Sequence, residues 1–391
     1  MGPVLVSLFG KFSELLFAGL LLGFFPPGSS ASAPAGAAVK VIRTPNPSAP
    51  LTERWKWAKT EADKQGIAKG YWSAYSIQRL MWENSTIGSV YSDPRRNRPT
   101  LREVITGTES IDDRNPSGWG NDDDGDGLNW NDDKSSRREV MKEVAVLFHF
   151  SGSGTSEPDR VRISNLNLHV EMDDEPLLWL GGASDGESLA FLKALFTSSQ
   201  GSDIRKEIVT AVGLHAPSEA VFSFLRDVLN SSDAPRVREQ AAFWLGQMNN
   251  DEALAVLMHA ANTDRSDKVR EQAVFAVSQM DGDRGLNALI KLTADESSAD
   301  VQKKAAFWLG QRASEKATAA LKDIVYSSKE TEIQKNALFA LTQCSDGKAI
   351  DDVIRIAKTH PNPKIRKEAI FWLGQIDNKR AIDALIDIVR Q

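Results

Sequence analysis

The chain has 391 residues, of which 41% are hydrophobic and 26% are charged, a composition that excludes a wholly disordered protein. Its net charge of −6, from 53 acidic against 47 basic residues, lacks the basic excess of a nucleic-acid groove, so we expect no nucleic acid as a partner. Cys344 is the single cysteine, which excludes an internal disulfide and leaves packing to hold the fold.

Residues 1–37 predict a signal peptide. Lys11 precedes an apolar run of 11 residues from Leu15 to Phe25, and Ala35-Gly36-Ala37 offers small residues for cleavage. A membrane-spanning helix needs about 20 apolar residues. We therefore expect export to the periplasm or the extracellular space, and no integral membrane protein after cleavage. An uncleaved N-terminal anchor is the alternative.

Residues 38–50 predict a Pro-rich linker, and residues 51–183 predict a small α+β unit. Aromatic residues at helical spacing predict helices over Leu51 to Gln65 and Gly70 to Trp82. Such aromatic side chains normally pack inward as a core, and a ligand-binding cluster is the alternative. The aromatic residues concerned are Trp55, Trp57, Tyr71, Trp72, Tyr75 and Trp82.

Three apolar runs later in this unit predict a small sheet. Val140 to Phe150 alternates as a strand, and a short loop separates it from Val161 to Met172, which predicts a hairpin. The apolar phase slips between Ile163 and Leu166, indicating a bulge or a break. Leu177 to Leu180 predicts one further short strand.

An Asp-rich loop at residues 121–133 predicts a candidate calcium site. Counted from Asp122, carboxylates fall at positions 1, 3, 5 and 12, with glycine at position 6. This spacing lets a turning loop wrap oxygen ligands around Ca²⁺, and the loop resembles those of dockerin and thrombospondin type. A merely solvated loop is the alternative, since aspartate replaces the usual bidentate glutamate at position 12. The ligands would be Asp122, Asp124, Asp126, the carbonyl of Leu128, and Asp133.

Ser184 lies in a Gly-x-Ser-x-Gly pattern that is typical of hydrolase nucleophiles. Glu187 follows three residues later and predicts instead a capping box that opens a helix. A hydrolase would also need a histidine, an acid and a large parallel sheet downstream, where helical patterns follow. We expect no catalytic residue here.

Residues 184–391 predict an α-solenoid of helical hairpins, so the fold class is mainly α. Five similar segments start 32 residues apart, at Val237, Val269, Val301, Ile333 and Ile365. In each, a β-branched residue, an alanine four later and an aliphatic residue eight later share one helical face. A second amphipathic helix follows each segment, and the hairpins must stack because one alone cannot bury its apolar face.

A period of 64 residues is superimposed on the repeats. Tryptophan and alanine alternate at one position, and glycine alternates with serine or threonine two positions later. We expect the indole of one repeat to fill the space beside the alanine of the next. Ile204 to Leu214 continues the pattern degenerately. The alternating position holds Trp244, Ala276, Trp308, Ala340 and Trp372.

The motif from Val237 to Gly246, followed by an Ala-x-x-x-Leu helix, resembles HEAT-like repeats of the phycobilisome-lyase type over residues 204–391. The resemblance implies the α-solenoid. It implies no single activity, because the family includes chromophore lyases, a metal-dependent hydroxylase and plain scaffolds. The hydroxylase holds iron with His-Glu pairs, and none of the five histidines here precedes a glutamate.

We expect the protein to be an exported scaffold that binds a protein partner through its repeats. The alternative is an accessory factor or a lyase-like enzyme with a pocket between the aromatic unit and the solenoid. Self-association through the C-terminal face is also expected, because Phe371 and Trp372 keep the internal repeat pattern there. One column on the second helices is expected to face the partner on the concave side as a ladder of charges. It comprises His259, Lys291, Asp323, Arg355 and Asp387.

Overall fold

The computed structural model describes residues 39–83, 85–88, 99–107, 138–294, 298–312, 314–344 and 347–390. The predicted signal peptide and the Asp-rich loop lie outside these residues. The chain divides into two compact units, the first ending at Ala216 and the second spanning Pro217–Gln391. None of the described helices is long and apolar enough to cross a membrane.

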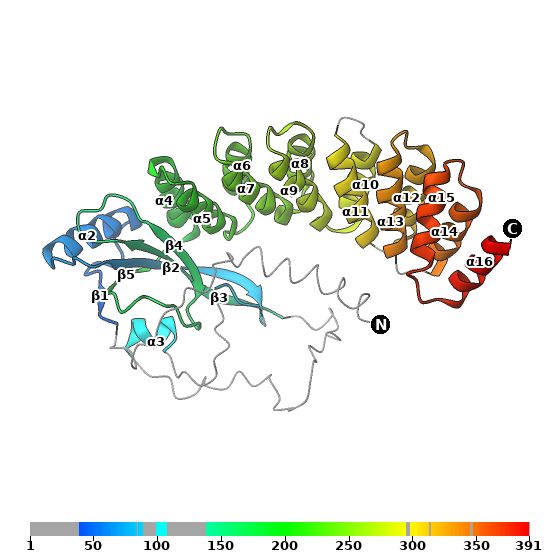
Figure 1. Cartoon of the computed structure of the whole chain (residues 1–391). Helices are drawn as coiled ribbons and strands as arrows, with labels where there is room; N and C mark the ends of the chain where they lie inside the picture. Colours follow the sequence, from blue (N-terminus) through cyan, green and yellow to red (C-terminus); the bar gives the residue numbers. More distant parts are fainter. Residues whose placement is uncertain are drawn as a thin grey trace, which may run out of the picture. The chain divides into compact units, whose positions relative to one another are not determined.

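The first unit is built on a five-stranded sheet in the order β1-β5-β2-β3-β4 (Figure 1). Strand β5 runs parallel to β1 and β2, while β3 is antiparallel to β2 and β4. The strands are β1 (Val41–Arg43), β2 (Tyr71–Trp82), β3 (Glu139–Phe150), β4 (Arg160–Asn165) and β5 (Leu177–Gly182). The helices of this unit are α2 (Leu51–Lys64), α3 (Leu101–Thr106), α4 (Asp185–Ser198) and α5 (Ser202–Gly213).

The helix predicted over residues 51–65, the β3–β4 hairpin and the short strand β5 are confirmed, and β4 breaks at Asn165, where the apolar phase slips. The helix predicted over Gly70 to Trp82 is wrong, because this segment forms β2. Strand β2 lies between β3 and β5, and its residues from Tyr71 to Ile77 are all buried. A strand buried on both faces loses the alternation that identifies strands. A further correction concerns residues 41–43 of the predicted linker, which form β1.

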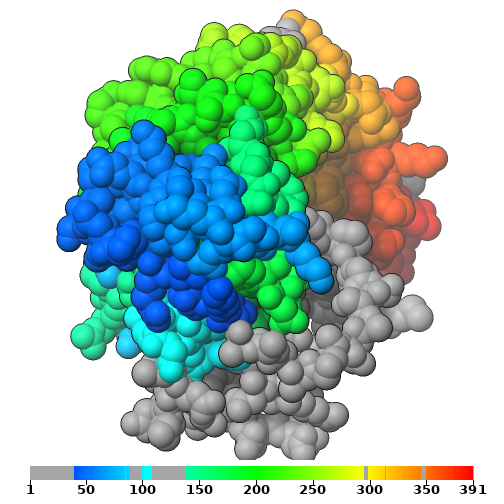
Figure 2. All heavy atoms as spheres, turned by 90° about the vertical axis from the view of Figure 1, so that its left-hand side faces the viewer, coloured from blue at the N-terminus to red at the C-terminus, as the bar shows by residue number. Residues whose placement is uncertain are grey.

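Helices α2 and α4 pack against one another and against β2. The hydroxyl groups of Tyr75 and Ser188 are 2.8 Å apart, and the ring of Phe191 lies 4.9 Å from that of Trp55. The guanidinium of Arg54 donates hydrogen bonds to carbonyls of β5. These contacts attach α4 to the first unit, which ends at Ala216. Figure 2 shows the early residues of this unit, in blue, as one continuous surface.

The second unit is a stack of helices (Figure 1). Its first helices are α7 (Pro235–Met248), α9 (Asp267–Gln279), α11 (Ala299–Gln311), α13 (Thr331–Gln343) and α15 (Pro363–Leu373). Its second helices are α6 (Glu219–Leu229), α8 (Asp251–Thr263), α10 (Gly282–Ala294), α12 (Glu315–Ser327), α14 (Gly347–Thr359) and α16 (Lys379–Arg390). Each of α8, α10, α12 and α14 packs more extensively on the first helix that follows it than on the one before it. The compact hairpin is therefore a second helix with the next first helix.

The repeat core is the predicted one: Val237, Ala241 and Leu245 are buried in α7, as are their counterparts in the later repeats. The residue after each β-branched position has a role that the pattern did not predict. Its side chain donates a hydrogen bond to a carbonyl at or near the end of the preceding second helix, which satisfies a group that a helix end leaves unpaired. These residues are Arg238, Arg270, Gln302, Gln334 and Arg366.

Two kinds of contact alternate between neighbouring first helices and explain the 64-residue period. A Cβ placed on Gly246 would lie 2.9 Å from the Cβ of Ala276, so α7 and α9 approach closely at this point. Between α9 and α11, by contrast, the rings of Phe275 and Trp308 are 5.1 Å apart. The close contact then recurs at Gly310 in α11 against α13, and the aromatic contact recurs between α13 and α15. The expected pairing of indole with alanine is corrected, because the indole packs on a phenylalanine of the preceding repeat.

Candidate functional site

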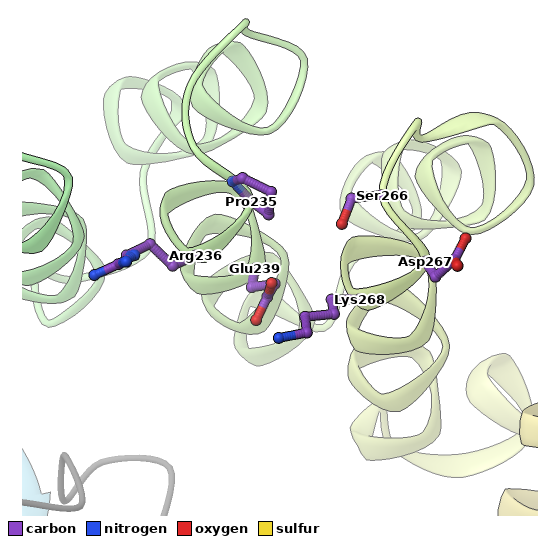
Figure 3. Close-up of a pocket in the computed structure, with 6 residues that line it drawn as sticks. All are labelled: Pro235, Arg236, Glu239, Ser266, Asp267 and Lys268. Atoms are coloured by element: carbon purple, nitrogen blue, oxygen red, sulfur yellow. The ribbon is translucent and has the colours of Figure 1, made fainter.

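A groove of about 500 Å³ lies between the N-terminal ends of α7 and α9. Figure 3 shows Lys268 of α9 pointing towards Glu239 of α7 across the gap, while Arg236 and Asp267 point away from it. Both signs of charge therefore occur around one hollow, a surface suited to a polar protein segment rather than to an apolar ligand. The lining residues are Pro235, Arg236, Glu239, Ser266, Asp267 and Lys268.

The first helices and the second helices form two layers with different spacing. Neighbouring first helices pack extensively, whereas neighbouring second helices make few close approaches. The expectation that the second helices line the concave side stays a prediction. The groove lies on the first-helix layer.

The column predicted from the sequence is exposed at all five positions, one on each of α8, α10, α12, α14 and α16. Two of its members have ion-pair partners outside the column. Arg355 pairs with Asp352 on its own helix, and Asp387 lies 3.6 Å from the ammonium of Lys358. At Arg355 and Asp387, therefore, ion pairs with residues outside the column, and not with other members of the column, hold the side chain. It comprises His259, Lys291, Asp323, Arg355 and Asp387.

Ion pairs between repeats are a feature that we did not predict. Arg284 lies 2.7 Å from Asp251, and Lys316 lies 3.6 Å from Asp283, in each case at the start of neighbouring second helices. The sequence signal for these ion pairs is a basic residue that follows an acidic residue after 33 positions. Both acids are exposed, so each pair contributes at most about 1 kcal/mol.

The aromatic residues of the first unit mostly form its core, as expected. Tyr71, Trp72 and Tyr75 are buried in β2, and Trp55 packs edge-on against the ring of Phe148 at 5.1 Å. These four aromatic side chains are thus occupied by packing and do not present a surface to a ligand. Trp57 is partly buried and Trp82 is exposed.

A charged cluster around His149 was also not predicted. Its Nδ1 contacts a carboxylate oxygen of Asp159, and its Nε2 lies 2.8 Å from a carboxylate oxygen of Glu175. Since both ring nitrogens contact carboxylates, we interpret His149 as a link between the β3–β4 turn and the segment before β5. Gly70 lies beside it with a backbone φ of +140°, a conformation that residues with a side chain rarely adopt.

The capping box at Ser184 is confirmed. The Ser184 hydroxyl accepts a hydrogen bond from the backbone N–H of Glu187, and the Glu187 carboxylate accepts one from the backbone N–H of Ser184, both at 3.3 Å. This serine therefore begins α4. Across the part of the chain that the structure describes, no group of three or more His, Cys, Asp or Glu side chains is placed to hold a metal ion. The predicted calcium ligands lie outside that part.

The family model for HEAT repeats matches residues 188–278 and 323–391. No curated protein matches the chain. The chain therefore carries HEAT repeats, and the α-solenoid predicted from the motif is confirmed.

Several solved structures are similar. Human deoxyhypusine hydroxylase in complex with glycerol is 21% identical, with 53% of this chain and 79% of that one covered and a TM-score of 0.23. The complex of CpcE and CpcF of phycocyanin lyase from Nostoc is 18% identical, with 52% and 80% covered and a TM-score of 0.30. The protein YibA of E. coli is 18% identical, with 52% and 76% covered and a TM-score of 0.33.

Proposed function

We propose that this chain is an exported scaffold that binds a protein partner through the surface of its HEAT repeats. The observation that carries the proposal is the groove between α7 and α9, where charges of both signs border a hollow on the closely packed first-helix layer. Stacked repeats offer extended surfaces of this kind, and proteins commonly bind there. The partner segment that fits is polar and carries both signs of charge.

The exposed column on the second helices is the other surface that we propose for partner binding. It presents one exposed side chain per repeat over five consecutive second helices. Its charges are of mixed sign, so it would select a partner by the order of charges along a segment. A partner could use one layer or both, and a labelling experiment separates these cases.

Site-specific photo-crosslinking in the native host tests the proposal. A photoreactive residue replaces Lys268 in the groove in one variant and Asp323 in the column in another. The matched control carries it at Lys56, which is exposed on α2 in the first unit. We expect one protein adduct from position 268, position 323 or both, and not from position 56. Purified partner should then bind more weakly, by at least tenfold, to a Glu239→Lys/Lys268→Glu variant or to an Asp323→Lys variant, according to the adduct. Equal labelling at all three positions, or none, would exclude binding through the repeats.

We also propose that the Asp-rich loop binds calcium with a dissociation constant of about 10⁻⁴ to 10⁻³ M, as extracellular calcium modules do. The spacing of its carboxylates supports this. Calorimetric titration of the protein should show calcium binding that is lost in an Asp124→Asn/Asp126→Asn variant. Asp123→Asn is the matched control, since position 2 of such a loop supplies no ligand, and it should leave binding unchanged. Absence of calcium-dependent heat in the parent would contradict the proposal.

A further inference from the structure

Strands β2 and β3 extend past their neighbours in the sheet as a two-stranded arm. Strand β5 pairs with β2 only as far as Ser76, and β4 pairs with β3 only from Val144 to His149. Beyond these points β2 and β3 pair with one another up to Trp82 and Glu139. In Figure 1 the light-blue end of β2 lies in this arm. Within the part of the chain that the structure describes, this end of β2 has a strand on one side only.

The free edge of β2 carries main-chain groups that have no partner among the described residues. Further back along this edge, the C=O of Ser76 accepts a hydrogen bond from the N–H of Ala183. Main-chain groups alternate between the two edges of a strand, so those of Gln78 and Leu80 face the same edge as those of Ser76. Neither residue makes a main-chain hydrogen bond there to a described residue. Such an edge is a template on which another strand can pair.

Exposed apolar side chains lie beside this edge, on one face of the arm. Side chains alternate across a strand, so Leu80 and Trp82 share a face, and Met141 of β3 lies directly opposite Leu80. The three side chains are 51%, 45% and 59% exposed, in the order Leu80, Trp82 and Met141. Edge strands are commonly protected by charged side chains or proline, and the edge positions Gln78, Leu80 and Trp82 carry neither. The edge and its apolar face therefore suit an extended peptide.

We propose that an extended segment of a partner protein binds along β2 from Gln78 to Trp82 and adds a sixth strand to the five-stranded sheet. Main-chain hydrogen bonds to Gln78 and Leu80 hold this segment, and an apolar side chain of the segment covers Leu80 and Met141. Beside Trp82, the indole face and the exposed carboxylate of Glu139 favour a lysine or an arginine. The partner segment is thus a short strand with an apolar residue beside Leu80 and a basic residue two positions away.

Fluorescence anisotropy with a synthetic peptide tests the added strand. The probe is a labelled peptide in which valine alternates with threonine and one valine is replaced by lysine. It should bind the protein saturably, and Leu80→Pro should weaken binding by at least tenfold, because proline removes an N–H on the free edge. Leu80→Lys should weaken binding similarly by placing a charge in the apolar row.

A matched control separates this edge from exposed aromatic positions elsewhere. Tyr326→Lys changes an exposed aromatic residue of α12 in the second unit and should leave peptide binding unchanged. Circular dichroism checks that each variant keeps its secondary structure. The proposal fails if the parent shows no saturable binding, or if Tyr326→Lys loses as much affinity as the two Leu80 variants.

Methylation of peptide nitrogens distinguishes strand addition from adhesion of apolar side chains. An added strand pairs with β2 through one of its own edges only. Two probes carry N-methyl groups at alternate residues, one probe on each edge of the peptide. One of them should lose at least tenfold in affinity and the other should bind like the parent peptide. Equal affinities of the two methylated probes would overturn the pairing.

Two other occupants of the edge would also overturn the proposal. A dimer that forms without peptide in sedimentation equilibrium, and that Leu80→Pro abolishes, would show that a second copy occupies the edge. Peptide binding that appears only after deletion of residues 108–137 would show that this chain occupies its own edge. The added strand does not depend on binding through the repeats, so Glu239→Lys/Lys268→Glu should leave peptide binding unchanged.

Discussion

Arg238 of α7 carries a buried charge that forms an ion pair with Asp264, the residue that follows α8. It is 1% exposed, and its guanidinium donates hydrogen bonds of 3.1 and 2.8 Å to the carboxylate of Asp264, which is itself 9% exposed. Arg238→Met would leave that carboxylate buried without its main partner. We expect a loss of about 3–5 kcal/mol in the free energy of unfolding, measured by urea denaturation.

Two further variants separate the charge effect from a loss of packing. Arg226→Met removes an exposed ion pair with Asp227 and should cost less than about 1 kcal/mol. Arg238→Met/Asp264→Leu removes both buried charges and should recover most of the loss. An equal loss in Arg226→Met and Arg238→Met would contradict the role assigned to burial.

Two tyrosine side chains of β2 should lose their phenolic protons at a higher pH than a free tyrosine does. Burial, and then the charge of Asp63, raise the pKa of Tyr71 from its ordinary value of 10.0 to about 12. Burial also raises the pKa of Tyr75, against the opposing effect of its hydrogen bond with Ser188. Between pH 10 and about 12 the unfolded chain therefore releases a proton from Tyr71 that the native state keeps. The free energy of unfolding must fall as the pH rises through this window.

Ultraviolet absorbance of the ionised phenol measures this titration. Tyr71→Phe should remove part of the late-ionising absorbance. A single early transition for all tyrosines would show that β2 is open to solvent.

At the scale of elements, Gly246 holds α7 close to α9. A Cβ there would lie 2.9 Å from both the Cβ and the carbonyl oxygen of Ala276, so Gly246→Ala should destabilise the stack by about 1–3 kcal/mol through overpacking. Gly374 is the matched control, because it has φ −68° and its nearest contact would be 3.3 Å away. Gly374→Ala should be neutral or stabilising by up to about 1 kcal/mol. Urea denaturation of both variants checks the difference, which would vanish if the helices can separate without cost.

The sequence predicts the elements unevenly, for physical reasons. The repeats are predictable because the same positions bury the same residue types five times. Strand β2 is not, because burial on both faces removes its alternation. An amphipathic pattern shows that α4 has an apolar face, but not that Phe191 packs on Trp55 rather than on another repeat.

Of the candidate surfaces, only the one that depends on the periodicity of single helices could be predicted from the sequence. Exposure of the column at His259 and its counterparts is predictable, because it depends only on helical periodicity. The groove depends on how the starts of two helices face one another, which a pattern along one helix does not contain. The link at His149 joins three separate segments, and no local spacing could have predicted it.

At the scale of the whole molecule, the mature protein should begin near Ala38, because the apolar run is short and small residues follow it. N-terminal sequencing of the exported product measures this. Ala37→Phe should block cleavage and lead to accumulation of the precursor, whereas Lys40→Gln, beyond the cleavage site, should be processed normally. An exported product that retains Met1 would favour the uncleaved anchor.

Because close contacts and aromatic contacts alternate along the stack, neighbouring first helices fit together only if repeats of the two kinds alternate. Deletion of residues 267–298 would place α11, which carries Trp308, directly against Gly246, where the structure has the small side chain of Ala276. Deletion of residues 267–330 would bring Ala340 to that place, as it already stands against Gly310. A chain of this kind can therefore change its length readily only in steps of two repeats. The 64-residue pair, rather than the single hairpin, is the unit by which such a protein can be copied, lengthened or shortened.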